Sequence, residues 1–434
     1  MTTRRNFLQA SLLASAASLA APKIFGRTKP TEQTPLPPPI AALKSMKDLA
    51  KPITKDERRT RIARATELMQ QNKLDAILIS SGTSLQYFSN IKWWLSERFF
   101  GMILPTQGRP FYVCPAFERD RAMEQISQGP LDHDPDIRTW QEDENPYALL
   151  VQGLKDRGIT TGRLGIEERT YFVYSNSIVQ LAPALELVSA TPVTAGCRMI
   201  KSEHELELMQ LANNVTLKAF EAVHRSAKPG MTDRDIGTLI TTAHDRLGFA
   251  GDALVLVGDS SALPHGSIQP KVAREGTIIL IDGGCGVEGY QSDISRTFVL
   301  GKFDPKLKDK MQSVFEIVHR AQSAALAAAK PGVEAQSVDA AARKVINDAG
   351  YGPDYAHFTH RVGHGIGMDG HEWPYLVRGD TIPLQPRMCF SDEPGIYLRG
   401  EFGVRLEDDM HITDDGAKLF TPQSPSLEEP FVKA

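Results

Sequence analysis

The chain has 434 residues, of which 41% are apolar and 24% charged, so it is an ordinary globular protein long enough for two or three domains. Its formal charge of −4 and the lack of a dense basic run argue against a nucleic-acid partner. Four cysteines without short paired spacing indicate neither a zinc finger nor a disulfide framework.

Residues 1–26 are predicted to be a targeting segment, not part of the fold. Arg4 and Arg5 precede Phe7 and Leu8, as in twin-arginine export signals, and an alanine-rich apolar stretch follows over 10–21. This stretch is too short for a stable membrane span. We therefore expect export by the twin-arginine route to a bacterial periplasm. The alternative is a disordered or amphipathic N-terminus that contains two arginines by chance.

Residues 27–53 are predicted to form an extended linker or arm, because five prolines fall between residues 27 and 51 with little periodic apolar content. A first domain is expected over 54–195. It begins with a capping-box pattern at Thr54 and Glu57, ahead of a helix. Strand-like segments then alternate with helical ones such as 118–126, which favours an α/β layer structure: 76–79, 101–104, 111–113 and 164–166.

A second domain is expected over 196–434, and it contains an internal repeat. Helices are predicted over 203–225, 233–247 and 307–328. The segment 227–231 recurs at 329–333, a displacement of 329 − 227 = 102 residues, and Gly248 recurs as Gly350 with the same displacement. Each half is therefore expected to be one copy of a common unit.

Each copy is followed by two acids that flank a glycine-rich turn. Asp282 and Asp293 follow the first copy, whereas Glu393 and Glu407 follow the second, together with His364. Such turns join antiparallel strands, and acids on paired strands face one another across the ladder. Two such hairpins would bring four carboxylates onto one sheet face. These would repel one another unless divalent cations held them, so the pattern predicts a dinuclear metal site.

The motifs around these acids resemble those of the creatinase/prolidase/methionine aminopeptidase family. The resemblance covers about 55–425 and is closest to its Xaa-Pro dipeptidase and Xaa-Pro aminopeptidase branch. It implies an α/β creatinase-like N-terminal domain followed by an α+β pita-bread domain with an internal pseudo-two-fold repeat. The motifs that carry it are Asp282-Gly-Gly, Tyr290-Gln-Ser-Asp293, His360-Arg-Val-Gly-His364, Asp392-Glu393-Pro-Gly and Gly403-Val-Arg-Leu-Glu407-Asp-Asp.

By this resemblance, Asp293 and Glu407 bridge two divalent metal ions, Asp282 binds one ion, and His364 and Glu393 bind the other. Manganese is the first expectation, with zinc, cobalt or iron as alternatives. Such a pair would provide a bridging hydroxide to attack the scissile carbonyl. Glu393 would take up its proton as general base.

Four more residues are candidates for catalytic roles. The resemblance places His265 beside the substrate, His371 as the partner of the oxyanion and His360 as a supporting or proton-relay group. Each of these histidines has the alternative of being a packed or surface residue. Arg405 is expected to orient a carboxylate ligand or a substrate terminus, with a structural salt bridge as the alternative.

The function predicted is a metal-dependent exopeptidase that cleaves the Xaa-Pro bond of dipeptides or peptide N-termini. A homodimer is expected from the family, with Trp93, Trp94 and Arg98 as candidates for a loop near the neighbouring site; the alternative is a buried aromatic pair with a surface arginine. A metal-dependent lyase or small-molecule hydrolase on the same scaffold remains the alternative function. The intact ligand set argues against a binding protein that has lost catalysis, and the export signal argues against a methionine aminopeptidase.

Overall fold

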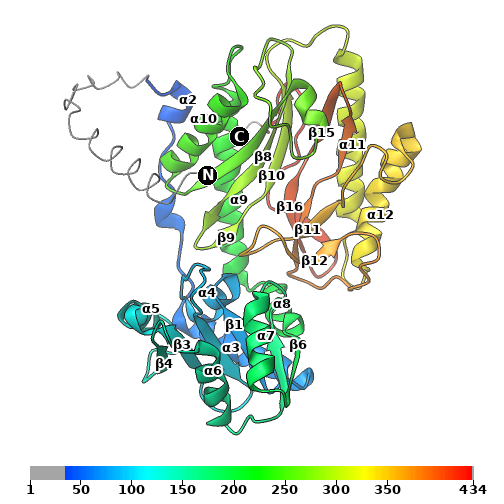
Figure 1. Cartoon of the computed structure of the whole chain (residues 1–434). Helices are drawn as coiled ribbons and strands as arrows, with labels where there is room; N and C mark the ends of the chain where they lie inside the picture. Colours follow the sequence, from blue (N-terminus) through cyan, green and yellow to red (C-terminus); the bar gives the residue numbers. More distant parts are fainter. Residues whose placement is uncertain (1–34, 433–434) are drawn as a thin grey trace, which may run out of the picture. The chain divides into compact units, whose positions relative to one another are not determined.

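The computed structural model describes residues 35–432, and its backbone is shown in Figure 1. The predicted targeting segment lies outside the described residues, so its export role stays a prediction. Among the helices that the structure describes, none combines the length and the apolar character needed to cross a membrane. Residues 38–434 belong to one compact unit. The predicted boundary between residues 195 and 196 stays a prediction.

The N-terminal part is an α/β layer on a six-stranded sheet with the order β4-β3-β2-β1-β5-β6. Its strands are β1 (Ala76–Ser80), β2 (Gly101–Pro105), β3 (Phe111–Pro115), β4 (Asp136–Trp140), β5 (Gly162–Ile166) and β6 (Leu185–Ser189). Its helices are α3 (Lys55–Gln71), α4 (Thr83–Ser89), α5 (Arg119–Ser127), α6 (Pro146–Lys155), α7 (Phe172–Leu181) and α8 (Thr191–Arg198). The predicted capping box at Thr54 and Glu57 is present at the start of α3.

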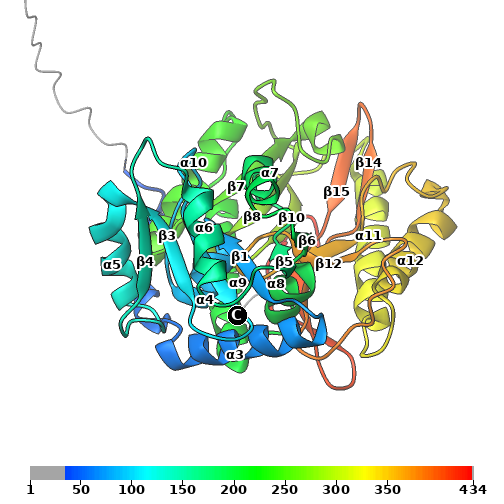
Figure 2. The same cartoon turned by 60° about the horizontal axis from the view of Figure 1, so that its bottom comes forward.

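Both faces of this sheet are covered by helices, as Figure 2 shows. Ile77 and Ile79 of β1 pack in one core with residues of α3, whereas Leu78 packs in a separate core with residues of α6 and α7. The four predicted strands are confirmed as β1, β2, β3 and β5. The sequence did not predict β4 and β6, the two edge strands, in which polar residues interrupt the apolar ones and only one residue of each strand is fully buried.

The C-terminal part has the pita-bread arrangement of helices outside curved sheets. Its long helices are α9 (Glu203–His224), α10 (Asp233–Leu247), α11 (Lys308–Ala328) and α12 (Ala335–Ile346), of which the first three were predicted. One sheet has the order β10-β8-β7 with β9 beside β8: β7 (Gly251–Val257), β8 (Ile278–Val287), β9 (Tyr290–Gln291) and β10 (Ile294–Val299).

A second sheet of this part has the order β12-β11-β13-β16-β17. Its strands are β11 (Gly363–Gly365), β12 (Glu372–Leu376), β13 (Cys389–Asp392), β16 (Asp408–Ile412) and β17 (Ala417–Leu419). A separate hairpin of β14 (Gly395–Leu398) and β15 (Phe402–Arg405) occupies the predicted glycine-rich turn between Glu393 and Glu407. The two larger sheets are joined by an isolated bridge between Ser295 and Glu407, so the acids lie on two bridged sheets and not on a single one.

The predicted repeat is confirmed by matching backbone hydrogen bonds. Gly230 N donates to Ala273 O at 2.8 Å in the first copy, and Gly332 N donates to Leu384 O at 2.8 Å in the second. In both copies the glycine has a left-handed φ, +96° and +82°, and a helix begins a few residues later. The same local sequence therefore produces the same turn before α10 and before α12.

Part of the predicted extended arm is instead folded against the C-terminal part. Residues Pro38–Ala41 form a short helix, α2, whose Ile40 is completely buried in the core that includes residues of α9 and α10. Met46 N donates to Leu247 O at 2.8 Å, and Arg246 donates to Ala41 O at 3.1 Å. The prediction of an extended linker is wrong for this segment, because one apolar side chain and these backbone bonds fix it.

The two repeat-related glycines allow a test of this packing. Gly248 and Gly350 both have a left-handed φ, +93° and +88°, so alanine at either position costs about 1 kcal/mol in backbone strain. A methyl group at Gly248 would also lie 2.7 Å from Ser45 Oγ of the arm, whereas one at Gly350 would meet nothing within 4 Å. We expect Gly248→Ala to lower the free energy of unfolding more than Gly350→Ala does, as measured by denaturant titration.

The control is Ser45→Gly in the Gly248→Ala background, which removes the clashing hydroxyl. This double variant is expected to recover stability towards that of Gly350→Ala. Equal losses for the two single alanine variants would show that the arm does not pack at Gly248.

Candidate metal centre

The first pair of predicted ligands lies on the β8–β10 hairpin. Asp282 of β8 is opposite Ser295 of β10, and Asp293 lies two residues before Ser295. Asp293 is therefore diagonal to Asp282. The expectation that the two acids lie directly opposite each other is wrong for this pair. Residues two apart on a strand share a face, so both carboxylates can still reach the same side of the ladder.

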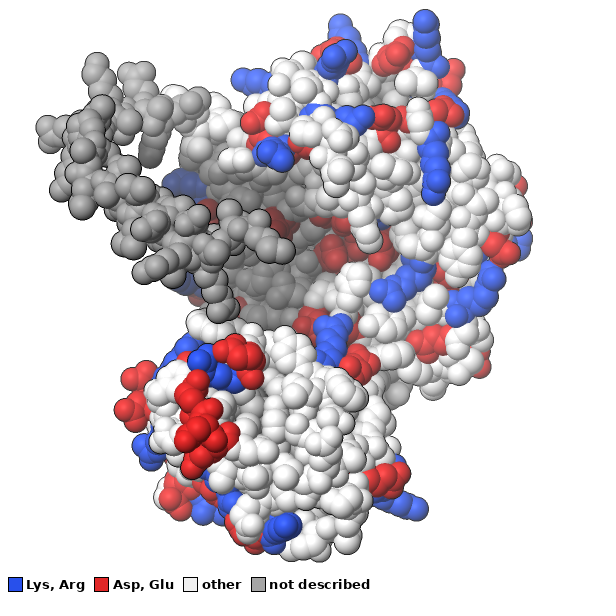
Figure 3. All heavy atoms as spheres, viewed as in Figure 1, with Lys and Arg blue, Asp and Glu red and all other residues white. Residues whose placement is uncertain are grey.

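The second pair lies at the adjoining ends of β13 and β16. Glu393 directly follows β13, and Glu407 directly precedes β16. Asp392 of β13 is opposite Asp408 of β16, so Glu393 and Glu407 occupy the next opposed positions of this ladder. Glu407 N donates to Ser295 O at 3.2 Å, which ties the second ladder to the first. The two hairpins thereby bring their four acids close together in space. In the sequence, the first and last of them, Asp282 and Glu407, are 407 − 282 = 125 residues apart. Acidic side chains are visible inside a hollow of the molecular surface in Figure 3.

The structure brings all five predicted ligands together. Donor atoms of Asp282, Asp293 and Glu407 lie within 4.8 Å of one another, and so do those of His364, Glu393 and Glu407. Glu407 belongs to both groups. Asp293 connects them again, because its Oδ2 lies 3.9 Å from His364 Nε2. This is the arrangement expected of two neighbouring cation sites that share carboxylates.

The electrostatics of the cluster favour a bound cation. Burial, and then the neighbouring carboxylates, raise the pKa values of Asp293 and Glu407 well above those of ordinary acids. Burial also raises the pKa of Glu393 to about 8 and lowers that of His364 to about 3. The imidazole is therefore neutral and able to act as a ligand. Positive charge among these acids would restore their ionised form, so the residues present fit a divalent metal.

Asp282 differs from the other acids because a buried arginine lies beside it. Burial is the largest influence and raises the pKa of Asp282, but Arg405 and hydrogen bonds outweigh it and hold that pKa below its usual value. Arg405 Nη2 lies 2.6 Å from Asp282 Oδ2, and its Nη1 donates to the hydroxyl of Tyr397 at 3.0 Å. Ser295 Oγ lies 2.8 Å from Asp282 and 2.7 Å from Glu407. Arg405 thus orients a candidate ligand.

Several partners of the cluster were missed by sequence reasoning. Asp409 Oδ2 accepts hydrogen bonds from Asp293 N at 3.0 Å and from Asn213 Nδ2 at 2.9 Å, which fixes the backbone of a candidate ligand. Arg296 forms a buried ion pair with Asp408 at 2.6 Å. The two acids directly follow Glu407, a signal that was available in the motif. Asn213 lies within the apolar stripe of α9 and had no such signal.

The three candidate catalytic histidines are placed differently. His371 stacks on His364 with ring centroids 3.7 Å apart, and its Nδ1 lies 3.2 Å from a nitrogen of Arg361. His360 Nε2 lies 2.6 Å from the hydroxyl of Tyr397, and its Nδ1 lies 3.8 Å from Glu393. A third group of donor atoms within 4.8 Å of one another consists of Asp293, His364 and His371. His265 is exposed and belongs to none of the three groups found among the described residues, but Arg405 Nη1 donates to the carbonyl oxygen of the preceding residue, Pro264, at 3.1 Å. The predicted position of His265 beside the substrate stays a prediction.

The aromatic pair proposed for a neighbouring site has separate surroundings. Trp93 is buried and stacks on Phe100 with ring centroids 4.2 Å apart, whereas Trp94 is 71% exposed. Arg98 forms an ion pair with Glu142 at 2.9 Å. The alternative of a buried aromatic pair with a surface arginine therefore fits Trp93 and Arg98 but not the exposed Trp94.

A cluster of buried acids and one imidazole on paired hairpins of a pita-bread fold defines a metal-dependent hydrolase. The model of metallopeptidase family M24 matches residues 207–414, and that of the creatinase/prolidase N-terminal domain matches residues 61–200. The chain belongs to metallopeptidase family M24, and it is a metallo-exopeptidase.

Full-length relatives share both parts of the chain. An Xaa-Pro dipeptidase of Lactobacillus delbrueckii subsp. lactis is 33% identical over 366 residues, which cover 83% of this chain and 96% of the relative. The crystal structure of dipeptidase PepE from Mycobacterium ulcerans is 30% identical with a TM-score of 0.80, covering 88% of this chain and 100% of that one. An X-Pro aminopeptidase from Thermotoga maritima is 28% identical with a TM-score of 0.67, covering 83% and 97%.

The pair of Arg361 and His371 gives a prediction for the pH dependence of activity. Burial and the positive charge of Arg361 lower the pKa of His371, so its imidazole stays neutral at neutral pH. Removing the charge in Arg361→Gln raises that pKa, and His371 then becomes protonated at a higher pH. We expect the acidic limb of the kcat/KM profile to move to higher pH. Arg378→Gln, at an exposed ion pair with Asp354, is the control and should leave the limb in place. An unmoved limb in Arg361→Gln would exclude His371 as the titrating group.

Proposed function

We propose that this protein is a dinuclear metal-dependent peptidase that hydrolyses the Xaa-Pro bond of dipeptides or peptide N-termini. One observation carries the proposal: two groups of three donors overlap at Glu407. The named activities of the similar Xaa-Pro dipeptidases and X-Pro aminopeptidase support the substrate class.

In this proposal Asp293 and Glu407 are shared between two cations, Asp282 completes one site, and His364 and Glu393 complete the other. Mixed carboxylate and imidazole ligands suit manganese first, with zinc, cobalt and iron as alternatives. Two cations held by these residues would activate water as a nucleophile and polarise the scissile carbonyl.

The side chains of the chain itself account for the proton transfers and the charge stabilisation. Glu393 would take up a proton as general base, and its Oε2 lies 3.8 Å from Nδ1 of His360. His371 is neutral and lies against His364, where it can donate a hydrogen bond to the developing oxyanion. Arg405 keeps Asp282 charged, and Tyr397 connects Arg405 to His360.

The direct test is an assay of metal-loaded protein against matched peptides. We expect turnover of Leu-Pro, of Leu-Pro-Gly or of both, and at least about 100-fold lower kcat/KM for Leu-Ala and Leu-Ala-Gly. The reason is that a pocket shaped for the proline ring loses its contacts with an open side chain. Turnover of the tripeptide alone would define an aminopeptidase. Absence of turnover for every peptide would contradict the proposal and favour a metal-dependent lyase or small-molecule hydrolase.

The shared role of Asp293 is tested by Asp293→Ala. Losing a carboxylate common to both sites is expected to reduce bound metal, measured by elemental analysis, and to lower kcat by at least about 100-fold. Asp309→Ala, at an exposed position in the first turn of α11, is the control. Retention of two metal ions per chain in Asp293→Ala would remove the bridging assignment.

We also propose that the enzyme is exported to the periplasm by the twin-arginine route and acts as a homodimer. The pair Arg4 and Arg5 before an apolar stretch supports export. Replacing both arginines with lysine should retain the enzyme in the cytoplasm, and sedimentation of the mature protein should give twice the mass of the chain. Normal export of the lysine variant, or a monomer, would contradict the respective proposal.

A further inference from the structure

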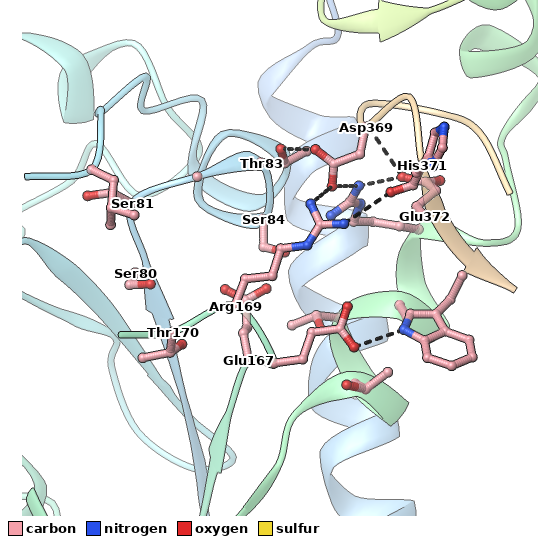
Figure 4. Close-up of a pocket in the computed structure, with 18 of the residues that line it drawn as sticks. Ser80, Ser81, Thr83, Ser84, Glu167, Arg169, Thr170, Asp369, His371 and Glu372 are labelled. Carbon is pink, nitrogen blue, oxygen red and sulfur yellow. Dashed lines mark hydrogen bonds and ion pairs between the residues drawn. The ribbon is translucent and has the colours of Figure 1, made fainter. Parts of the chain in front are cut away.

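A pocket of about 340 Å³ lies beside the metal centre and shares one residue, His371, with it. We call it the strand-end pocket. Its walls are the segments 80–84, 93–95, 167–170 and 191–198 of the N-terminal part and 369–373 of the C-terminal part. Figure 4 shows the turn with Asp369, His371 and Glu372 on one side and Ser81, Ser80 and Thr170 on another. Its volume suits a ligand the size of an amino acid or a dipeptide.

The pocket lies where open α/β sheets place their ligands. Strands β1 and β5 are parallel neighbours, and the segments 80–84 and 167–170 directly follow their carboxyl ends. From β1 the chain continues to β2 on one side, whereas from β5 it continues to β6 on the other. Such a change of direction leaves a crevice at the ends of the two strands, and small ligands bind there in this fold class.

Most charges around the pocket already neutralise one another. Arg198 forms ion pairs with Asp369 at 2.7 Å and with Glu372, and Lys201 lies 2.6 Å from Glu372. Two cations thus balance two acids within one network. The charged residues of the pocket outside this network are Glu167, Glu168 and Arg169, all on the segment after β5.

Glu167 and Arg169 remain available to a ligand. Glu167 is half-buried, and no ion pair of it is found in the described part of the chain. Burial raises its pKa to about 7, although a hydrogen bond with Ser84 and the charge of Arg198 act in the opposite direction. The ionised carboxylate therefore gains from a cationic partner. Arg169 is exposed, and its guanidinium lies 3.3 Å from His371 O and 3.9 Å from Asp369, which are weak contacts. Glu168 instead accepts a hydrogen bond from Trp373 at 3.0 Å.

The remaining lining suits the uncharged part of a small molecule. Hydroxyl groups come from Ser81 and Thr170, which can donate and accept hydrogen bonds, and from Thr83, which donates to Asp369 and can only accept. The indoles of Trp94 and Trp373 provide apolar surface, and Trp94 is 71% exposed. A ligand with an apolar body and both an ammonium and a carboxylate group would match these surroundings.

We propose that the strand-end pocket binds a small zwitterion, a free amino acid or a dipeptide, with its ammonium group at Glu167 and its carboxylate at Arg169. Because Arg169 also donates to His371 O, the occupant would contact the segment that holds His371 against His364. Glu167 and Arg169 are not among the residues that carry the proposed peptidase chemistry, so the pocket proposal can be tested independently of it.

The test uses the intact metal-loaded enzyme and tryptophan fluorescence. Three of the four tryptophans, Trp93, Trp94 and Trp373, line the pocket, so their emission reports occupancy. The probe is L-leucine, compared with N-acetyl-L-leucine, which lacks the ammonium group, and L-leucinamide, which lacks the carboxylate. We expect a saturable change with leucine and at least about tenfold weaker binding of both derivatives.

Substitutions then assign the site. Glu167→Gln and Arg169→Gln should each weaken leucine binding by about tenfold or more, whereas Glu186→Gln, at an exposed position of β6 outside the pocket, should not. Leucine bound as a product at the metal centre would be insensitive to Glu167→Gln. The proposal is overturned by equal affinities of wild type and both pocket variants, by the absence of a saturable signal, or by N-acetyl-L-leucine binding as tightly as leucine.

Discussion

The chemistry of the candidate metal centre depends on carboxylates that are held close together away from water and therefore repel one another. Burial and the proximity of its neighbours raise the pKa of Asp293 and of Glu407, so without positive charge these acids favour protonation. Such a cluster is costly to the fold on its own account. A bound cation removes this cost, because the carboxylates that repel one another each attract the cation. The metal-binding capacity of this chain is therefore a property of the acids as a group, not of any one of them.

The internal repeat is what makes such a cluster possible. One hairpin places two acids, Asp282 and Asp293, on one face of its ladder, and the other two acids must come from another part of the chain. A second copy, joined to the first by the bridge between Ser295 and Glu407, supplies them from the opposite direction. Arg405 then breaks the symmetry of the two copies, because its guanidinium pairs with Asp282 alone among the candidate ligands. The acids consequently differ in pKa: that of Asp282 lies below its usual value, whereas that of Glu393 is raised to about 8.

The sequence predicted those features that depend on local patterns. Helices with clear caps, such as the one that starts after Thr54, and the acids that flank glycine-rich turns were recognised because the signals lie within a few residues. Contacts between distant segments could not be read in this way. Nothing near Ile40 shows that it is buried by the core around α9 and α10, and nothing near Asn213 shows that it holds Asp409. The exposed position of His265 likewise depends on the conformation of its loop, which composition does not determine.

The N-terminal part bears on the chemistry through the turn that carries His371. This turn is fixed from outside the metal centre, since Asp369 accepts from Thr83 of α4 and pairs with Arg198 of α8. Glu372, one residue after His371, is held by Arg198 and Lys201. The side chain of His371 meets the candidate ligand His364, while its backbone faces the strand-end pocket. Because one short turn contacts both sites, a change in the N-terminal part can reach His371 and, through the stacked rings, the candidate ligand His364.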